Sequence, residues 1–221
     1  MRASHGLAEP DRSVCVLGLG LVLAACSPEP APLEPPAPIE PPSAQAQYVG
    51  GQQCVACHGA EAALWAGSHH DLAMQAADAQ SVLGDFSAAP FTSNGVTSEF
   101  FVRDGAYWIR TDGPDGALAE YEITHTFGAE PLQQYLVGFP DGRYQALSVA
   151  WDSRPAAQGG QRWFELYPDD GIDHTDPLHW TGAFQNWNGS CAECHSTNVR
   201  KRYAPAQDRF DTRYSSIDVD C

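Results

Sequence analysis

Hydrophobic and polar positions follow a strand-like pattern through the middle of the chain. Ser98–Val102 and Tyr107–Thr111 are short runs rich in β-branched and aromatic residues. Asp104-Gly105 lies between them and is a tight-turn signal, so the two runs predict a β-hairpin. Glu120–Phe127 alternates between two faces, which is typical of a half-buried strand.

Further runs extend this pattern toward the C-terminus. Gln133–Phe139 and Tyr144–Trp151 are separated by Pro140-Asp141-Gly142, which predicts a second hairpin, and Arg162–Tyr167 predicts another strand. We therefore expect an antiparallel β-rich insert of roughly four to six strands over about residues 91–167. His125 falls on one of these strands, where packing is favoured over metal ligation.

The flanking segments have a different character. The stretch from about Ala60 to Ala77 is rich in Ala, Leu, Met and Gln, which favour a helix. On such a helix His70 and Met74, four residues apart, share one face, and either could offer an axial ligand to a metal. The chain is irregular and aromatic from Pro168, and Lys201–Asp220 is polar and predicted to be peripheral.

The N-terminal segment predicts export. The apolar run Val14–Ala25 is too short to span a bilayer and fits the hydrophobic region of a signal peptide. Leu23-Ala24-Ala25-Cys26 resembles a bacterial lipobox, which implies cleavage after residue 25 and lipidation of Cys26. Ser27 follows, rather than the Asp of an inner-membrane retention signal, so the outer membrane is favoured. The alternative is a buried strand or helix with a chance cysteine.

Residues 26–47 contain eight prolines and little to bury. Such a segment is an extended, semi-rigid linker. We expect three parts: a lipoprotein signal peptide over 1–25, a Pro-rich linker over 26–47 and a folded domain over 48–221.

One pentapeptide pattern occurs twice, as Cys54-Val55-Ala56-Cys57-His58 and as Cys191-Ala192-Glu193-Cys194-His195. Cys-x-x-Cys-His is the attachment motif for c-type haem. The two thiols add across the two vinyl groups of one haem, and the adjacent histidine ligates the iron. The motifs therefore predict two haem c groups, with His58 and His195 as proximal iron ligands.

Two alternatives use the same cysteines differently. Cys54, Cys57, Cys191 and Cys194 could form one four-cysteine zinc site, or a pair could act as a thioredoxin-like redox couple. The histidine after each pair, the duplication and the export signal favour haem. Of the seven cysteines only Cys221, the last residue, stays without an assignment, so no disulfide framework is expected.

Longer segments around the motifs carry a family resemblance. They are Tyr48-Val49-Gly50, Ser68-His69-His70-Asp71-Leu72-Ala73-Met74, Thr126-Phe127-Gly128, Pro131-Leu132-Gln133-Gln134-Tyr135, Trp151-Asp152-Ser153-Arg154-Pro155, Asp176–Gly182, Asn186-Trp187-Asn188 and Cys191–Asn198. With the two motifs, they resemble a family of bacterial multihaem c-type cytochromes of the cytochrome c-552/c-554 type. Some members of that family carry tetratricopeptide repeats further along.

The resemblance implies a fold and a ligand set. The fold class would be α+β: a multihaem cytochrome c with short helices around the haems and the antiparallel β-rich insert. A third haem site would begin at Cys221, with the domain truncated there. His70 would be a distal iron ligand, and His174 or His179 is a candidate for the other haem, which favours bis-histidine ligation.

These observations favour periplasmic electron transfer with redox partner proteins and a lipid anchor in the membrane. The chain has 12 Lys and Arg against 28 Asp and Glu, which argues against nucleic acid and suits either a solvated surface or steering toward a basic partner. One alternative is a haem-based reductase or oxidase of a small nitrogen or sulfur compound, with His125 or Arg154 as proton donor. Another is an assembly module whose β-rich insert docks a partner.

Overall fold

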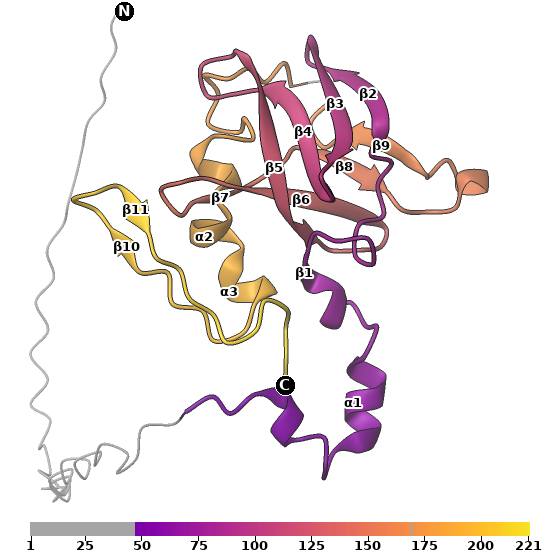
Figure 1. Cartoon of the computed structure of the whole chain (residues 1–221), viewed down its shortest axis with the longest axis vertical. Helices are drawn as coiled ribbons and strands as arrows, with labels where there is room; N and C mark the ends of the chain where they lie inside the picture. Colours follow the sequence, from indigo (N-terminus) through magenta and orange to yellow (C-terminus); the bar gives the residue numbers. More distant parts are fainter. Residues whose placement is uncertain (1–46, 169) are drawn as a thin grey trace, which may run out of the picture. The chain divides into compact units, whose positions relative to one another are not determined.

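A computed structural model of the chain describes residues 47–168 and 170–221 (Figure 1). The predicted signal peptide, the lipidation site Cys26 and nearly all of the predicted linker lie outside these residues.

Antiparallel β-structure dominates the described part. Nine strands form one sheet: β1 (Met74–Ala76), β2 (Ser87–Ser93), β3 (Val96–Arg103), β4 (Ala106–Asp112), β5 (Leu118–Phe127), β6 (Leu132–Gly138), β7 (Tyr144–Ala146), β8 (Val149–Asp152) and β9 (Arg162–Glu165). The main path runs β2-β3-β4-β5-β6-β8-β9, while β1 pairs with β5 and β7 with β6. Strands β2 and β9, at the two ends of this path, come close, so the sheet curls into a nearly closed barrel (Figure 1).

The remaining elements are short. The α-helices are α1 (Gly59–Trp65), α2 (Trp187–Ser190) and α3 (Ala192–His195), and the 3₁₀ turns are η1 (Gly51–Gln53), η2 (Asp71–Ala73), η3 (Ala156–Gln158) and η4 (Ala183–Gln185). Strands β10 (Tyr203–Ala204) and β11 (Arg209–Phe210) form a separate two-stranded ribbon.

The strand predictions are confirmed where alternation and turn signals agree. Strands β3 and β4 pair across a turn in which Asp104 and Gly105 both have positive φ, 52° and 81°. This backbone suits an Asp-Gly pair and matches the twist of a hairpin. The second predicted hairpin is present as β6 and β7, and β9 coincides with the run that begins at Arg162.

The barrel interior is an aromatic core. The side chains of Phe100 and Trp163 stack with ring centroids 3.6 Å apart, and Phe86 meets both edge-on. Burial of such large rings is the dominant stabilising contribution in a domain of this size. The core is therefore built from strands far apart in the sequence, with Phe100 on β3 and Trp163 on β9.

A second apolar cluster covers the outside of the sheet. Met74, Leu136 and Ala146 contribute from β1, β6 and β7, and Trp187 and Ala192 contribute from α2 and α3. Because Leu136 lies between Tyr135 and Val137, which belong to the barrel core, β6 is buried on both faces. This outer cluster, as we call it, holds α2 and α3 against the barrel.

Three sequence predictions about the fold are wrong: the fold class, the number of strands and the first helix. The α+β cytochrome fold with a β-rich insert is replaced by a mostly antiparallel barrel with a few short helices, and the strands exceed the four to six expected. The predicted helix over Ala60–Ala77 ends at Trp65, because Gly67 has a φ of 75° and Met74–Ala76 pairs with β5. Pairing with an existing strand outweighs the helix propensity of an Ala-rich segment.

Candidate functional site

The two Cys-x-x-Cys-His motifs adopt the same backbone turn. In the first, the N–H groups of Cys57 and His58 both donate to the carbonyl of Cys54, at 3.1 and 2.8 Å. The second repeats this pattern with Cys191 as acceptor, at 3.1 and 3.2 Å. Residues three apart on a helical turn lie on one side of it, so each motif presents its two thiols together. All five described cysteines are free thiols.

The first motif is open to solvent. Cys54 is half-buried, whereas Cys57 and His58 are exposed, and α1 contains no buried residue. Large apolar side chains around the motif are uncovered: Leu64 is 82% exposed and Val49 68% exposed. The segment therefore presents apolar surface that nothing in the described chain covers.

The second motif is docked on the barrel through the outer cluster. Ala192 and Trp187 are buried there and Cys191 is half-buried. Burial, and next the neighbouring Cys194, raises the pKa of the Cys191 thiol. The ring of His195 meets Phe127 edge-on at 4.5 Å, and burial lowers the pKa of this imidazole.

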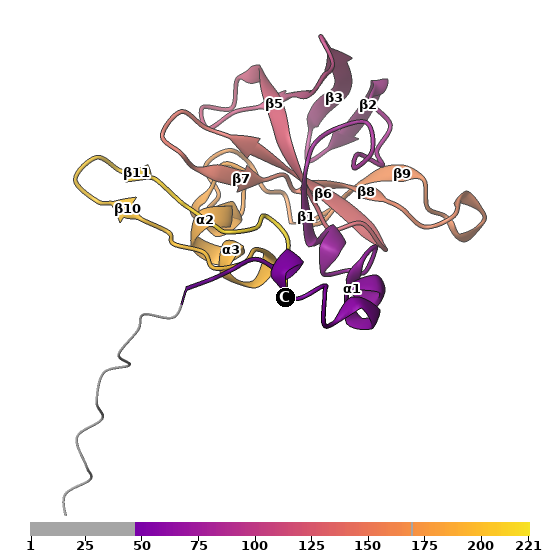
Figure 2. The same ribbon diagram turned by 60° about the horizontal axis from the view of Figure 1, so that its bottom comes forward.

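The C-terminal segment connects the two motifs. The Asp220 carboxylate accepts from the Tyr48 hydroxyl and from the Gly51 N–H, the latter at 2.9 Å, while its own N–H donates to Thr197 Oγ1 at 2.8 Å. Burial and the bond to Asp220 raise the pKa of Tyr48 to about 12. Asp220 thus bonds both to the segment that precedes the first motif and to the residues that follow the second. Figure 2 shows the C-terminus beside these segments.

Further hydrogen bonds secure this arrangement. Val219 accepts from Trp65 Nε1 at 2.8 Å and donates to the carbonyl of His70 at 3.2 Å. On the other side, Thr197 Oγ1 donates to the carbonyl of Asp218 at 2.8 Å. The prediction that Lys201–Asp220 is peripheral is therefore wrong for its last residues, and no pattern in that polar sequence indicated this role.

The candidate distal ligands are scattered. His70 is exposed before η2, but Met74 is fully buried in β1, so the expectation that the two share a helical face is wrong. His174 is exposed, with its ring over Gly116. His125 is half-buried on β5 against Tyr144, and burial lowers its pKa.

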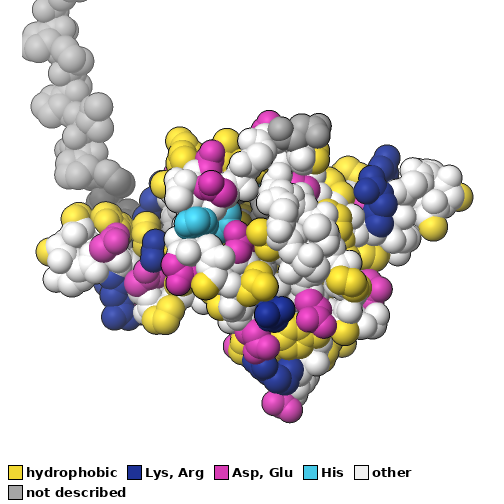
Figure 3. All heavy atoms as spheres, turned by 90° about the horizontal axis from the view of Figure 1, so that it is seen from above, with side chains coloured by type: hydrophobic (Ala, Val, Ile, Leu, Met, Phe, Trp, Pro, Cys, Tyr) yellow, Lys and Arg dark blue, Asp and Glu magenta, His cyan; other side chains and the backbone are white. Residues whose placement is uncertain are grey.

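His179 is buried at the end of the barrel remote from α1. Its Nε2 lies 3.1 Å from Asp112 Oδ2 and its Nδ1 lies 2.8 Å from Thr181 Oγ1. Both ring nitrogens are therefore engaged in hydrogen bonds in this conformation. The view from above the barrel shows histidine side chains among acidic groups on this face (Figure 3).

Outside the two motifs, the described residues bear on two further kinds of site. Among residues 47–168 and 170–221, no three His, Cys, Asp or Glu side chains gather as they would around a metal ion. Within the same residues, none of the helices has the length and apolarity needed to cross a bilayer.

Comparison with known proteins adds no assignment. No family model matches the chain, and neither the curated proteins nor the solved structures include a significant match.

Proposed function

We propose that this chain is a c-type cytochrome that carries haem c at each of its two motifs and transfers electrons in the bacterial periplasm. The observation that carries the proposal is the shared turn: in both pentapeptides the backbone of the second cysteine and of the histidine bonds to the carbonyl of the first cysteine, and the cysteines are free. That is the arrangement needed for thioether bonds from Cys54 and Cys57, and from Cys191 and Cys194, to one haem each.

The apolar surface around the first motif supports a large apolar occupant. Leu64, Val49 and Val55 are all substantially exposed in this segment. Covering such surface is favourable by roughly 25 cal/mol per Å² of apolar area removed from water. A haem attached at Cys54 and Cys57 would supply that cover, and His58 would hold its iron from the proximal side.

The link between the motifs supports exchange between two redox centres. Electron transfer slows steeply with distance, so cofactors that exchange electrons must be held close. Asp220 contacts the segments that precede Cys54 and follow His195. When bound, haem supplies an iron that accepts and releases one electron, and this chain fixes the two attachment points relative to each other.

The remaining parts of the proposal come from the sequence. His70 is the proposed distal ligand of one haem, and His174 or His179 remains the candidate for the other; ligation by His179 would require it to release its bonds to Asp112 and Thr181. A lipid at Cys26 would anchor the protein to the outer membrane, and the net charge of −16 would steer basic redox partners toward it.

Spectroscopy on the full chain, produced together with a c-haem maturation system, tests the proposal. Optical and electron paramagnetic resonance spectra should show two covalent haems, both low-spin, that are reduced and reoxidised reversibly. A high-spin haem whose spectrum changes on adding nitrite would favour the reductase alternative. A protein without covalent haem would overturn the proposal.

A further inference from the structure

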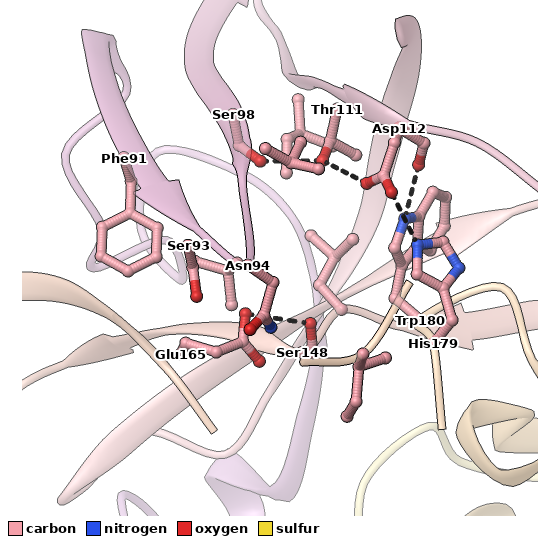
Figure 4. Close-up of a pocket in the computed structure, with 15 residues that line it drawn as sticks. Phe91, Ser93, Asn94, Ser98, Thr111, Asp112, Ser148, Glu165, His179 and Trp180 are labelled. Atoms are coloured by element: carbon pink, nitrogen blue, oxygen red, sulfur yellow. Dashed lines mark hydrogen bonds and ion pairs between the residues drawn. The ribbon is translucent and has the colours of Figure 1, made fainter. Parts of the chain in front are cut away.

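A small pocket with polar and aliphatic walls lies between strands of the barrel (Figure 4). Its volume is about 40 Å³, and its walls come from β2, β3, β4, β8, β9 and the loop that carries Trp180. A cavity needs about 10–15 Å³ of such volume to hold one water molecule, so this pocket has room for about three water-sized groups. Any occupant must therefore be very small.

One wall is a chain of hydrogen bonds. Ser98 Oγ lies 2.8 Å from Thr111 Oγ1, which donates to Asp112 Oδ1 at 3.2 Å. The Thr181 N–H donates to Nδ1 of His179 at 3.3 Å, which places the ring hydrogen on Nε2, facing Asp112 Oδ2 at 3.1 Å. The hydroxyl hydrogens of Ser98 and Thr111 and the ring hydrogen of His179 are all donated within this chain of bonds. The oxygen atoms of this wall can therefore only accept hydrogen bonds from a bound molecule.

The opposite wall carries the Glu165 carboxyl group. Glu165 is 9% exposed and accepts from Ser148 Oγ and from the Tyr167 N–H, both at 3.3 Å. These bonds engage both carboxylate oxygens, and each oxygen keeps a further lone pair that can accept a hydrogen bond. Burial raises the pKa of Glu165, and the hydrogen bonds that it accepts offset this only in part.

The floor between the two walls is aliphatic, with Ile109, Leu147 and Ile172 lining it. Acceptors thus face each other across an apolar base, and the exposed Asn94 adds an amide group at the mouth. A few convergent polar groups on an apolar surface are typical of a small-molecule site. The excess of acceptors and the two carboxyl groups select a cation with several N–H donors.

We propose that this pocket binds a compact primary ammonium cation of the size of methylammonium. Its three N–H groups bond to Glu165 and to hydroxyl lone pairs of the Ser98–Thr111 wall, and its carbon rests on the aliphatic floor. None of these residues belongs to either attachment motif. The pocket shares His179 with the candidate distal ligands, so the proposal applies to the conformation in which His179 is bonded to Asp112.

Calorimetric titration of the full-chain protein with methylammonium chloride tests the site. We expect saturable binding at pH 8 that potassium chloride and the bulkier tetramethylammonium chloride do not reproduce. Glu165→Gln keeps the shape but removes the charge, so it should weaken binding about tenfold or more, as expected for losing one charged hydrogen bond. Glu122→Gln, an exposed strand position, should bind as the wild type does.

The wild-type pH profile gives a second test that needs no variant. Binding should weaken on acidification as Glu165 takes up a proton, because burial raises the pKa of this carboxyl group. Asp112 and His179, which are bonded to each other on the opposite wall, also face the pocket. Absence of saturable binding at pH 8, equal affinity in Glu165→Gln, or affinity that does not fall on acidification would overturn the proposal. Haem content should be the same in both variants, which separates this outcome from failure of the proposed function.

Discussion

The same pentapeptide pattern occurs in two different settings in this protein. The second motif is docked on the barrel, where Trp187 and Ala192 are each 1% exposed. The first continues into α1, which has no fully buried residue, and this segment is held by hydrogen bonds from the C-terminal segment. The two motifs share the hydrogen bonds to the carbonyl of their first cysteine, and they differ in how the flanking residues pack.

The largest difference should appear when matched apolar side chains are removed next to each motif. Trp187→Ala empties a fully buried position in the outer cluster and should cost about 3–5 kcal/mol of unfolding free energy. Leu64→Ala at the exposed position on α1 should change it by less than about 0.5 kcal/mol. Denaturant unfolding of protein made without haem attachment, followed by circular dichroism, measures both. A similar loss of unfolding free energy in the two variants would contradict the difference in packing between the two motifs.

A smaller and local effect is expected at the C-terminal link. Asp220→Ala removes the acceptor for Tyr48 and Gly51 but keeps the N–H that bonds Thr197. The first-motif segment should lose about 1–3 kcal/mol of protection against opening, the cost of leaving these donors without their partner, while the second should be unaffected. Hydrogen exchange of the Gly51 amide reports this, and Asp208→Asn on the β10–β11 ribbon is the control. If amide hydrogens around Cys191 also exchanged faster in Asp220→Ala, the two motif segments would open together, and the expected difference between them would be contradicted.

The thiols should also react differently. Because burial raises the pKa of Cys191, its thiolate is scarcer at neutral pH, and it should alkylate more slowly than the exposed Cys194 and Cys57. Timed iodoacetamide labelling of the protein without haem, read by peptide mass spectrometry, gives the order. Equal rates at Cys191 and Cys57 would remove this distinction between the motifs.

The weakest effect concerns pH. His125 packs against Tyr144, which in turn contacts Trp187 beside the second motif. Burial lowers the pKa of His125, so the folded state keeps it neutral while the unfolded chain protonates near its usual 6.5. Stability should therefore be full above about pH 6.5 and fall as the pH drops below it. His125→Gln should flatten this dependence in unfolding measured at pH 7.5 and pH 5.5, and an unchanged slope would refute the role of His125.

Many strands of the sheet could be predicted from the sequence because turns and hydrophobic alternation depend on neighbouring residues. The Asp104-Gly105 turn and the alternation of Glu120–Phe127 predict elements that the structure contains. The spacing within each motif likewise predicts which thiols lie together. Such features depend on neighbours a few residues apart, and no distant partner has to be known.

The rest depended on contacts between distant segments. Met74 leaves the predicted helix because β5, fifty residues later, offers a strand to pair with. Asp220 reaches Gly51 across 169 residues, and a lone carboxylate in a polar tail gives no sign of that partner. The Glu165 pocket also needs the barrel to close before its walls meet. The predicted fold class is wrong because closure of the sheet depends on contacts between distant strands, and the sequence of a single strand does not reveal them.

Peptide mass mapping of the full chain after co-production with a c-haem maturation system tests the central claim most directly. The account predicts one haem mass on the peptide that contains Cys54 and Cys57, and one on the peptide that contains Cys191 and Cys194. Serine substitution of either pair should remove only its own adduct. Unmodified cysteines at both motifs, in a folded protein, would contradict the account.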